Sequence, residues 1–187
     1  MTTLIRDYGP TDERSWLLTR LLAFFDTTYF DDVKTKKTVL SAPSIEMVAT
    51  ELDRMTGLLD IEIDGHAATI DSIAVHPGAQ RSGTGRRLLD EGLRRLSPDV
   101  HTLDAWTRDD EGANSWYRTM GFQERQRYLH VYRADEAADP EDGFTTPDGL
   151  SLPVIAFMHA PIEREAEMRA KFARVHVCRQ YVMQLGE

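Results

Sequence analysis

Residues 73–89 constrain the fold of this chain more than any other segment. The apolar run Ile73-Ala74-Val75 predicts a buried strand, Gly83 and Gly85 predict a tight loop, and the leucines from Leu88 onward predict an amphipathic helix. A helix that starts in this way points several unpaired backbone N–H groups at one place. Such a place attracts phosphate, so the segment predicts an anion site at residues 80–87.

The local charge agrees with an anion site. Five arginines lie within residues 76–96, opposed there only by Asp90 and Glu91, although the whole chain has a formal net charge of −9. An acidic chain lacks the basic surface that general nucleic-acid binding needs. We therefore expect a polyphosphate-bearing small molecule at this loop, and no nucleic-acid partner.

The glycine spacing excludes two well-known phosphate loops. A Walker A loop needs Gly-Lys-Ser/Thr, which does not follow these glycines. A Rossmann loop needs a third glycine where Leu88 stands. The sequence therefore indicates a different kind of phosphate cradle.

The length of 187 residues suits one domain, with room for an appendage. No stretch approaches the ~18 consecutive apolar residues of a membrane span, and the charged N-terminal segment has no apolar signal region. Cys178 is the single cysteine, so it forms no internal disulfide. These features predict a cytoplasmic protein without membrane contact.

Hydrophobic periodicity predicts an α/β protein. We expect strands at residues 3–7, 44–51, 58–64, 67–76, 100–107, 122–133, 152–159 and 175–185, and helices at 10–25, 84–96, 109–120 and 161–173. The succession of strand, helix and strand across residues 67–133 implies partly parallel pairing with crossover helices. The acidic segment 134–143 is expected to be a solvated boundary.

Two motifs resemble one known family. The string Gln80-x-x-Gly83-x-Gly85, after a strand and Pro77, resembles the pyrophosphate-binding motif of the GNAT family of acyl-CoA N-acyltransferases. Residues 113–122, with a tyrosine before Gly-Phe, resemble a later helix of that family. The resemblance covers residues 1–133 and implies a GNAT acetyltransferase domain, in which a mixed central sheet has a splayed strand pair and helices on both faces. Residues 134–187 are expected to form a C-terminal extension that packs on this domain as a lid or a dimer element.

The resemblance also implies acetyl-CoA as the acyl donor. The glycines let the backbone approach the pyrophosphate closely, and the arginines add positive charge. The strand before the loop is expected to offer backbone groups to the pantetheine arm. The expected coenzyme-binding residues are Ile73, Ala74, Val75, Gln80, Arg81, Ser82, Gly83, Thr84, Gly85, Arg86, Arg87 and Asn114.

Acyl transfer to an amine needs a base, a stabiliser of the oxyanion and a proton for the departing thiolate. Tyr117 stands where many family members place a tyrosine near the coenzyme sulfur, and a phenol pKa of about 10 suits this donation. The backbone N–H of Val75 is expected to meet the oxyanion. Asp71 is the candidate base, on the same strand face as Ile73 by period-two alternation, although Thr69 occupies the position where the family often has glutamate. The alternative bases are Glu51, Glu62 and His66.

The expected reaction is transfer of an acetyl group from acetyl-CoA to a primary amine of a small-molecule or peptide acceptor, by direct attack in a ternary complex. Two alternatives stay open: a non-catalytic acyl-CoA-binding or regulatory module, and an enzyme that acetylates a protein N-terminus or lysine. His176 and Cys178 are too few for a zinc site, so no metal is expected. A homodimer is compatible with the C-terminal extension.

Overall fold

The computed structural model describes residues 3–134 and 145–186. Its strands are β1 (Leu4–Asp7), β2 (Ser44–Glu51), β3 (Arg54–Asp64), β4 (Ala67–Val75), β5 (Thr102–Thr107), β6 (Gln123–Ala134), β7 (Ile155–Pro161) and β8 (Arg174–Gln184). Its α-helices are α1 (Glu13–Phe24), α2 (Thr84–Arg95), α3 (Glu111–Thr119) and α4 (Glu165–Lys171). The short 3-10 helices are η1 (Pro10–Asp12), η2 (Pro77–Ala79) and η4 (Ile162–Arg164).

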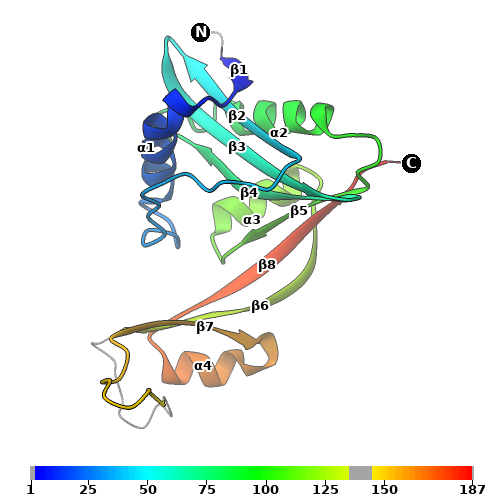
Figure 1. Ribbon diagram of the computed structural model, residues 1–187. Helices are drawn as coiled ribbons and strands as arrows, with labels where there is room; N and C mark the ends of the chain where they lie inside the picture. The colour runs from blue at the N-terminus through cyan, green and yellow to red at the C-terminus, as the bar shows by residue number, and fades with distance from the viewer. Residues whose placement is uncertain (1–2, 135–144, 187) are drawn as a thin grey trace.

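The strands of the described residues form one mixed sheet, in the order β1-β2-β3-β4-β5-β8-β6-β7 (Figure 1). β4 and β5 are parallel and are joined through α2, whereas the other neighbours are antiparallel. The predicted mixed α/β fold is therefore confirmed. β8 comes from the predicted C-terminal extension and pairs with both β5 and β6. The division of domains at residue 133 stays a prediction, and residues 135–144 of the acidic boundary lie outside the described residues.

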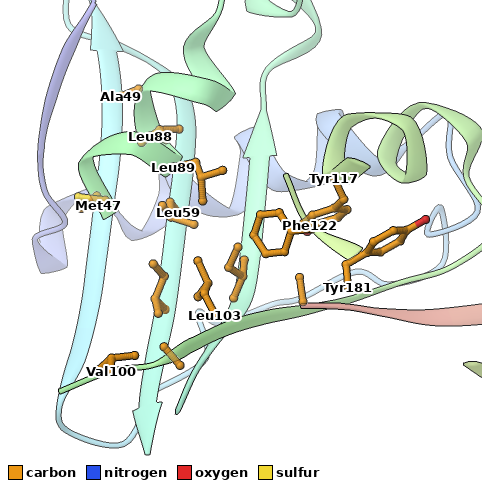
Figure 2. Close-up of a cluster of buried hydrophobic side chains, with 14 residues drawn as sticks. Met47, Ala49, Leu59, Leu88, Leu89, Val100, Leu103, Tyr117, Phe122 and Tyr181 are labelled. Atoms are coloured by element: carbon orange, nitrogen blue, oxygen red, sulfur yellow. The ribbon is translucent and has the colours of Figure 1, made fainter. Parts of the chain in front are cut away.

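Helices cover both faces of the sheet. Leu58 and Leu59 are neighbours in β3 and so point to opposite faces. Leu58 packs with Trp16 of α1 in one buried cluster. Leu59 packs with Leu88 of α2 and Tyr117 of α3 in a larger cluster on the other side (Figure 2). The sheet thus separates α1 from α2 and α3.

α2 approaches the sheet closely because glycines lie at the contact. A Cβ on Gly92 would stand 2.9 Å from Leu59 Cδ2 and 3.0 Å from Ile61 Cδ1. A Cβ on Gly57 of β3 would stand 2.9 Å from Leu88 Cδ1. The absence of these Cβ atoms sets the short distance between α2 and the sheet. It thereby also sets the position of the helix N-terminus relative to β4.

The far ends of β6 and β8, together with β7, extend away from the main helices and are covered by α4 (Figure 1). Leu129, Val177 and Met168 form a separate buried cluster there. β7 begins three residues later than predicted, because Pro153 has no N–H for a strand ladder. The predicted helix at 161–173 is confirmed in part, as η4 followed by α4.

Candidate functional site

A cleft of about 930 Å³ opens where β4 and β5 separate. The two strands pair from Ala67 opposite Thr102 to Ile70 opposite Ala105, and no further. Beyond this point β4 runs on to Val75 without β5 beside it. The splayed strand pair predicted from the sequence is therefore present, and the cleft lies in its opening.

The free edge of β4 offers backbone hydrogen-bonding groups to the cleft. The N–H of His76 donates to the carbonyl oxygen of Thr56 in β3 at 2.9 Å. Because backbone groups alternate in direction along a strand, the N–H groups of Ile73 and Val75 point the other way, toward the gap. Both residues line the cleft, as does Ala74.

The N-terminus of α2 forms one end of the cleft. Its N-cap residue Gly83 has φ +82°, a left-handed conformation that costs glycine little. The first helical bond in this turn runs from the Arg87 N–H to the Gly83 carbonyl at 3.0 Å. The N–H groups of Thr84, Gly85 and Arg86 therefore have no intrahelical partner. All three of these residues line the cleft, so their amides form a cradle for an anion.

Side chains around this cradle divide into two groups. Gln80, Arg81 and Arg86 line the cleft, and the Gln80 amide donates to the Val75 carbonyl at 3.4 Å. Ser82 is outside the lining, since its hydroxyl donates to Ala79 O at 2.6 Å. The last member, Arg87, is also outside the lining and donates to Thr3 Oγ1 at 2.9 Å and to the Ser82 carbonyl at 3.3 Å. The first group faces the cleft, whereas Ser82 and Arg87 bond within the loop and its neighbours.

Tyr117 lines the cleft from α3 with a nearly buried ring. The ring stacks on Tyr181 of β8, with 5.4 Å between the centroids, and contacts Trp116 and Phe122 edge-on. None of the described residues hydrogen-bonds its hydroxyl group, and burial raises the pKa of Tyr117 above its usual value. The ring is thus fixed while the hydroxyl keeps its proton at neutral pH.

Asn114 does not line the cleft. Its amide donates to the carbonyl oxygens of Arg108 and Asp110, at 2.9 and 2.6 Å, and its Oδ1 accepts from the Tyr181 hydroxyl at 2.8 Å. The side chain is buried and holds the start of α3 against β8. Its predicted contact with the coenzyme stays a prediction, and in the structure its hydrogen bonds are internal.

Asp71 lines the cleft at the point where the strands separate. It is the extra residue of a β-bulge, since Asp60 of β3 is opposite Ser72 while Ile61 is opposite Ile70. Ile70 and Ile73, three residues apart, consequently pack into the same cluster. The predicted grouping of Asp71 with Ile73 by simple alternation was therefore wrong, because the bulge interrupts the period.

The Asp71 carboxylate has two neighbours. The Ser72 hydroxyl donates to it at 3.0 Å, and the Lys34 ammonium lies 3.5 Å away. The alternative bases all lie outside the cleft lining. They bond elsewhere: Glu51 to Thr3, Glu62 to the Ser41 N–H and His66 to the Asp99 carbonyl.

The opposite end of the cleft is lined by residues that were not predicted as site residues. Arg20 comes from α1, while Tyr29 and Asp32 come from the segment that follows it. Arg20 is buried and donates to Asp32 Oδ2 at 2.6 Å. Burial raises the pKa of Tyr29 to about 12, and its hydroxyl accepts the Arg108 N–H at 2.8 Å. The aromatic residues in segment 26–37 were the sequence signal for this wall.

The described residues contain no group of three or more metal-ligating side chains. His176 bonds to Asp109 at 2.8 Å, and Cys178 is buried as a free thiol. Burial raises the pKa of that thiol. Within the part of the chain that the structure describes, no helix is both long and apolar enough to cross a membrane.

The family model of the acetyltransferase (GNAT) domain matches residues 43–124, which span β2 to the start of β6 and include both motifs. Over this range the chain is similar to the acetyltransferase (GNAT) domain. No curated protein matches the sequence significantly. The fold is, however, similar to solved structures of low sequence identity.

Three of those structures illustrate the similarity in fold. The ribosomal-protein-S18-alanine N-acetyltransferase from Escherichia coli is 17% identical with a TM-score of 0.59, and the match covers 100% of this chain and 96% of that chain. Arabidopsis thaliana NAA60 in complex with a bisubstrate analogue is 12% identical with a TM-score of 0.60, covering 98% of each chain. A GNAT family acetyltransferase from Elizabethkingia anophelis with acetyl-CoA bound is 16% identical with a TM-score of 0.53, again covering 98% of each chain.

Proposed function

We propose that this GNAT protein transfers an acetyl group from acetyl-CoA to a primary amine by direct attack in a ternary complex. One observation carries the proposal. A single cleft joins the amide cradle at Gly83, the free edge of β4 and the carboxylate of Asp71. Phosphate binding, thioester placement and proton removal therefore share one continuous surface.

The cleft residues fit an acyl-coenzyme A. The amides of residues 84–86 suit the pyrophosphate, and Arg81 and Arg86 add charge beside it. Backbone groups of Ile73 and Val75 suit the amide-bearing pantetheine arm, which would hydrogen-bond along the free edge of β4 as a neighbouring strand does. The volume of the cleft lies within the usual range for small-molecule sites, roughly 300–1,000 Å³.

The reaction forms one C–N bond and breaks one C–S bond. The neutral amine attacks the thioester carbonyl carbon, and the carbonyl oxygen carries negative charge in the intermediate. Its collapse expels coenzyme A as a thiolate, which takes up a proton. The nitrogen loses one proton, so the products are the acetamide and the free thiol.

Two side chains suit the proton transfers. Tyr117 suits donation to the thiolate, because its hydroxyl is protonated at neutral pH and makes no hydrogen bond to a described residue. Asp71 suits acceptance of the amine proton, directly or through water, because it lies at the point where the strands part. The Lys34 ammonium, 3.5 Å from Asp71, would have to move aside for an incoming amine. The Val75 N–H suits the oxyanion.

The acceptor is proposed to enter from the wall formed by Tyr29 and Asp32, opposite the amide cradle. Both a small amine and a peptide are within the proposal. The E. coli neighbour is named for acetylating an alanine of a ribosomal protein, which makes peptides a natural part of the test panel.

Release of the coenzyme thiol, measured against amines, amino acids, polyamines and peptides, tests the activity. With the best acceptor, Tyr117→Phe should lower kcat by about 10²-fold, whereas Tyr8→Phe, outside the cleft lining, should leave it unchanged. Asp71→Asn should also lower kcat. An unchanged kcat in both cleft variants would refute the assigned roles.

Binding is tested separately from turnover. Acetyl-CoA should raise the melting temperature, because a ligand that binds only the folded state stabilises it. At a concentration of 100 times Kd this stabilisation is about 2.7 kcal/mol. Gly83→Trp should abolish this shift by filling the cradle. A shift without turnover for any acceptor would favour the non-catalytic acyl-CoA-binding module, and no shift at millimolar acetyl-CoA would refute the proposal.

A further inference from the structure

The outward face of α1 is apolar although α1 is a surface helix. Leu18, Leu21 and Leu22 are 49%, 36% and 45% exposed, and Phe25, directly after the helix, is 65% exposed. Single exposed leucines are common, but a contiguous group of large apolar side chains marks an interaction surface. α1 lies at the outside of the sheet, and no other described helix covers this face (Figure 1).

The four side chains form one stripe. Their spacing of 18, 21, 22 and 25 is the i, i+3, i+4, i+7 pattern of a single helix face. The opposite face carries Trp16, which is fully buried against the sheet. α1 is therefore apolar on two sides, and the sheet accounts for only one of them.

Charges of opposite sign mark the two ends of the stripe. Arg14 lies one turn before Leu18, and Asp26 directly follows Phe25. Both are exposed, and neither makes an ion pair or a side-chain hydrogen bond with another residue in the ranges 3–134 and 145–186. By contrast, Arg20 on the buried side of the helix is paired with Asp32.

We propose that this stripe is the interface of a homodimer, in which the α1 helices of two copies pair antiparallel about a two-fold axis. In such a pair, a residue of one copy lies level with a residue of the other copy when their two numbers add up to one fixed value. An axis level with residue 20 brings Leu18 opposite Leu22 of the second copy, and the same axis brings Arg14 opposite Asp26. Both ends then gain an ion pair, and the apolar side chains are removed from water.

The arrangement is consistent with helix geometry. At a rise of about 1.5 Å per residue, Arg14 and Asp26 lie roughly 9 Å on either side of the axis. Antiparallel packing also places the positive end of one helix dipole beside the negative end of the other. A pair of short helices buries less surface than most specific complexes, which start at roughly 1,200 Å² in total. We therefore expect a reversible dimer with a Kd on the order of 10 µM.

Sedimentation equilibrium of the full chain, at roughly 1–300 µM to bracket that Kd, tests the proposal without reference to enzyme activity. The wild type should change from monomer to dimer across this range. Leu18→Glu combined with Leu22→Glu should remain monomeric. Val39→Glu, at an exposed apolar position outside the stripe, should dimerise as the wild type does. Far-UV circular dichroism and thermal unfolding confirm that each variant is folded.

Charge exchange tests the antiparallel register. Arg14→Asp or Asp26→Arg alone places like charges together at both ends and should weaken dimerisation about tenfold. The double variant, with both changes, should restore the wild-type Kd. A wild type that is monomeric throughout, a dimer that survives the two glutamates, or a double variant no tighter than the single ones would each overturn the proposal. If the wild type is monomeric and the variant with Leu18→Glu and Leu22→Glu loses turnover of a peptide, the stripe binds the acceptor. That result would also overturn the proposal.

Discussion

Asp60 gives the fold a specific dependence on pH. Its side chain is fully buried in β3, where the Lys37 ammonium lies 2.9 Å from Oδ2. Neither carboxylate oxygen accepts a hydrogen bond of good geometry from a described residue. Burial is the main cause that raises the pKa of Asp60 to about 6, and the nearby carboxylates of Glu46 and Asp71 raise it further.

The size and sign of the effect follow from this pKa. The unfolded chain titrates Asp60 near 3.8, so between pH 4 and 6 the folded protein binds more protons than the unfolded chain. The free energy of unfolding therefore falls as pH rises through that window. The contribution of Asp60 is fully present below pH 4 and is lost above pH 6. A difference of about two pKa units corresponds to about 3 kcal/mol.

Urea unfolding of the wild type and Asp60→Asn, from pH 4 to pH 7, measures the effect directly. Asparagine cannot ionise, so the stability of the wild type relative to the variant should fall by about 3 kcal/mol across this range. Asp64→Asn, at an exposed position of the same strand, is the matched control for the change of carboxylate to amide. A stability difference between wild type and Asp60→Asn that is constant from pH 4 to 7 would refute the reasoning.

Three further changes test other contacts by chemical denaturation. Gly57→Val should cost about 1–3 kcal/mol, because its Cβ would stand 3.1 Å from a backbone oxygen of β4; equal stability would contradict the close approach. Asn114→Ala should cost about 3 kcal/mol, because it removes three buried hydrogen bonds at the start of α3; a cost below that of an exposed alanine substitution would show that these bonds are dispensable. Asp32→Ala should cost about 1–2 kcal/mol, because it takes a carboxylate from the buried Arg20; salt should not change this cost if the pair is shielded.

The fold was predictable where its signals are local. The strand β4, the glycine loop and the apolar face of α2 follow one another along the chain, and each has its own sequence pattern. The place of β8 is different, because Leu103 pairs with Met183 far along the chain. Any apolar strand at the edge of β5 would satisfy the same pattern, so periodicity does not indicate which strand lies there.

The candidate site was predictable for the same reason and to the same extent. Gly83 and its neighbours form the cradle with their own backbone, and a local motif is sufficient to find them. The orientation of Asp71 depends on a bulge opposite β3, which alternation along one strand does not reveal. Arg20 and Tyr29 reach the cleft from a distant part of the chain, so their role becomes visible only when the elements are packed.

The interior position of β8 determines when the sheet can be completed during synthesis. On the ribosome, β8 is made after the other described strands of the sheet, yet it lies between β5 and β6. Until residues 174–184 have emerged, each of those two strands has a bare edge, which invites pairing with other chains. Tyr181 arrives with β8, and it is the ring on which Tyr117 stacks. A nascent chain that lacks this strand therefore has an unfinished sheet and a candidate catalytic tyrosine without its support.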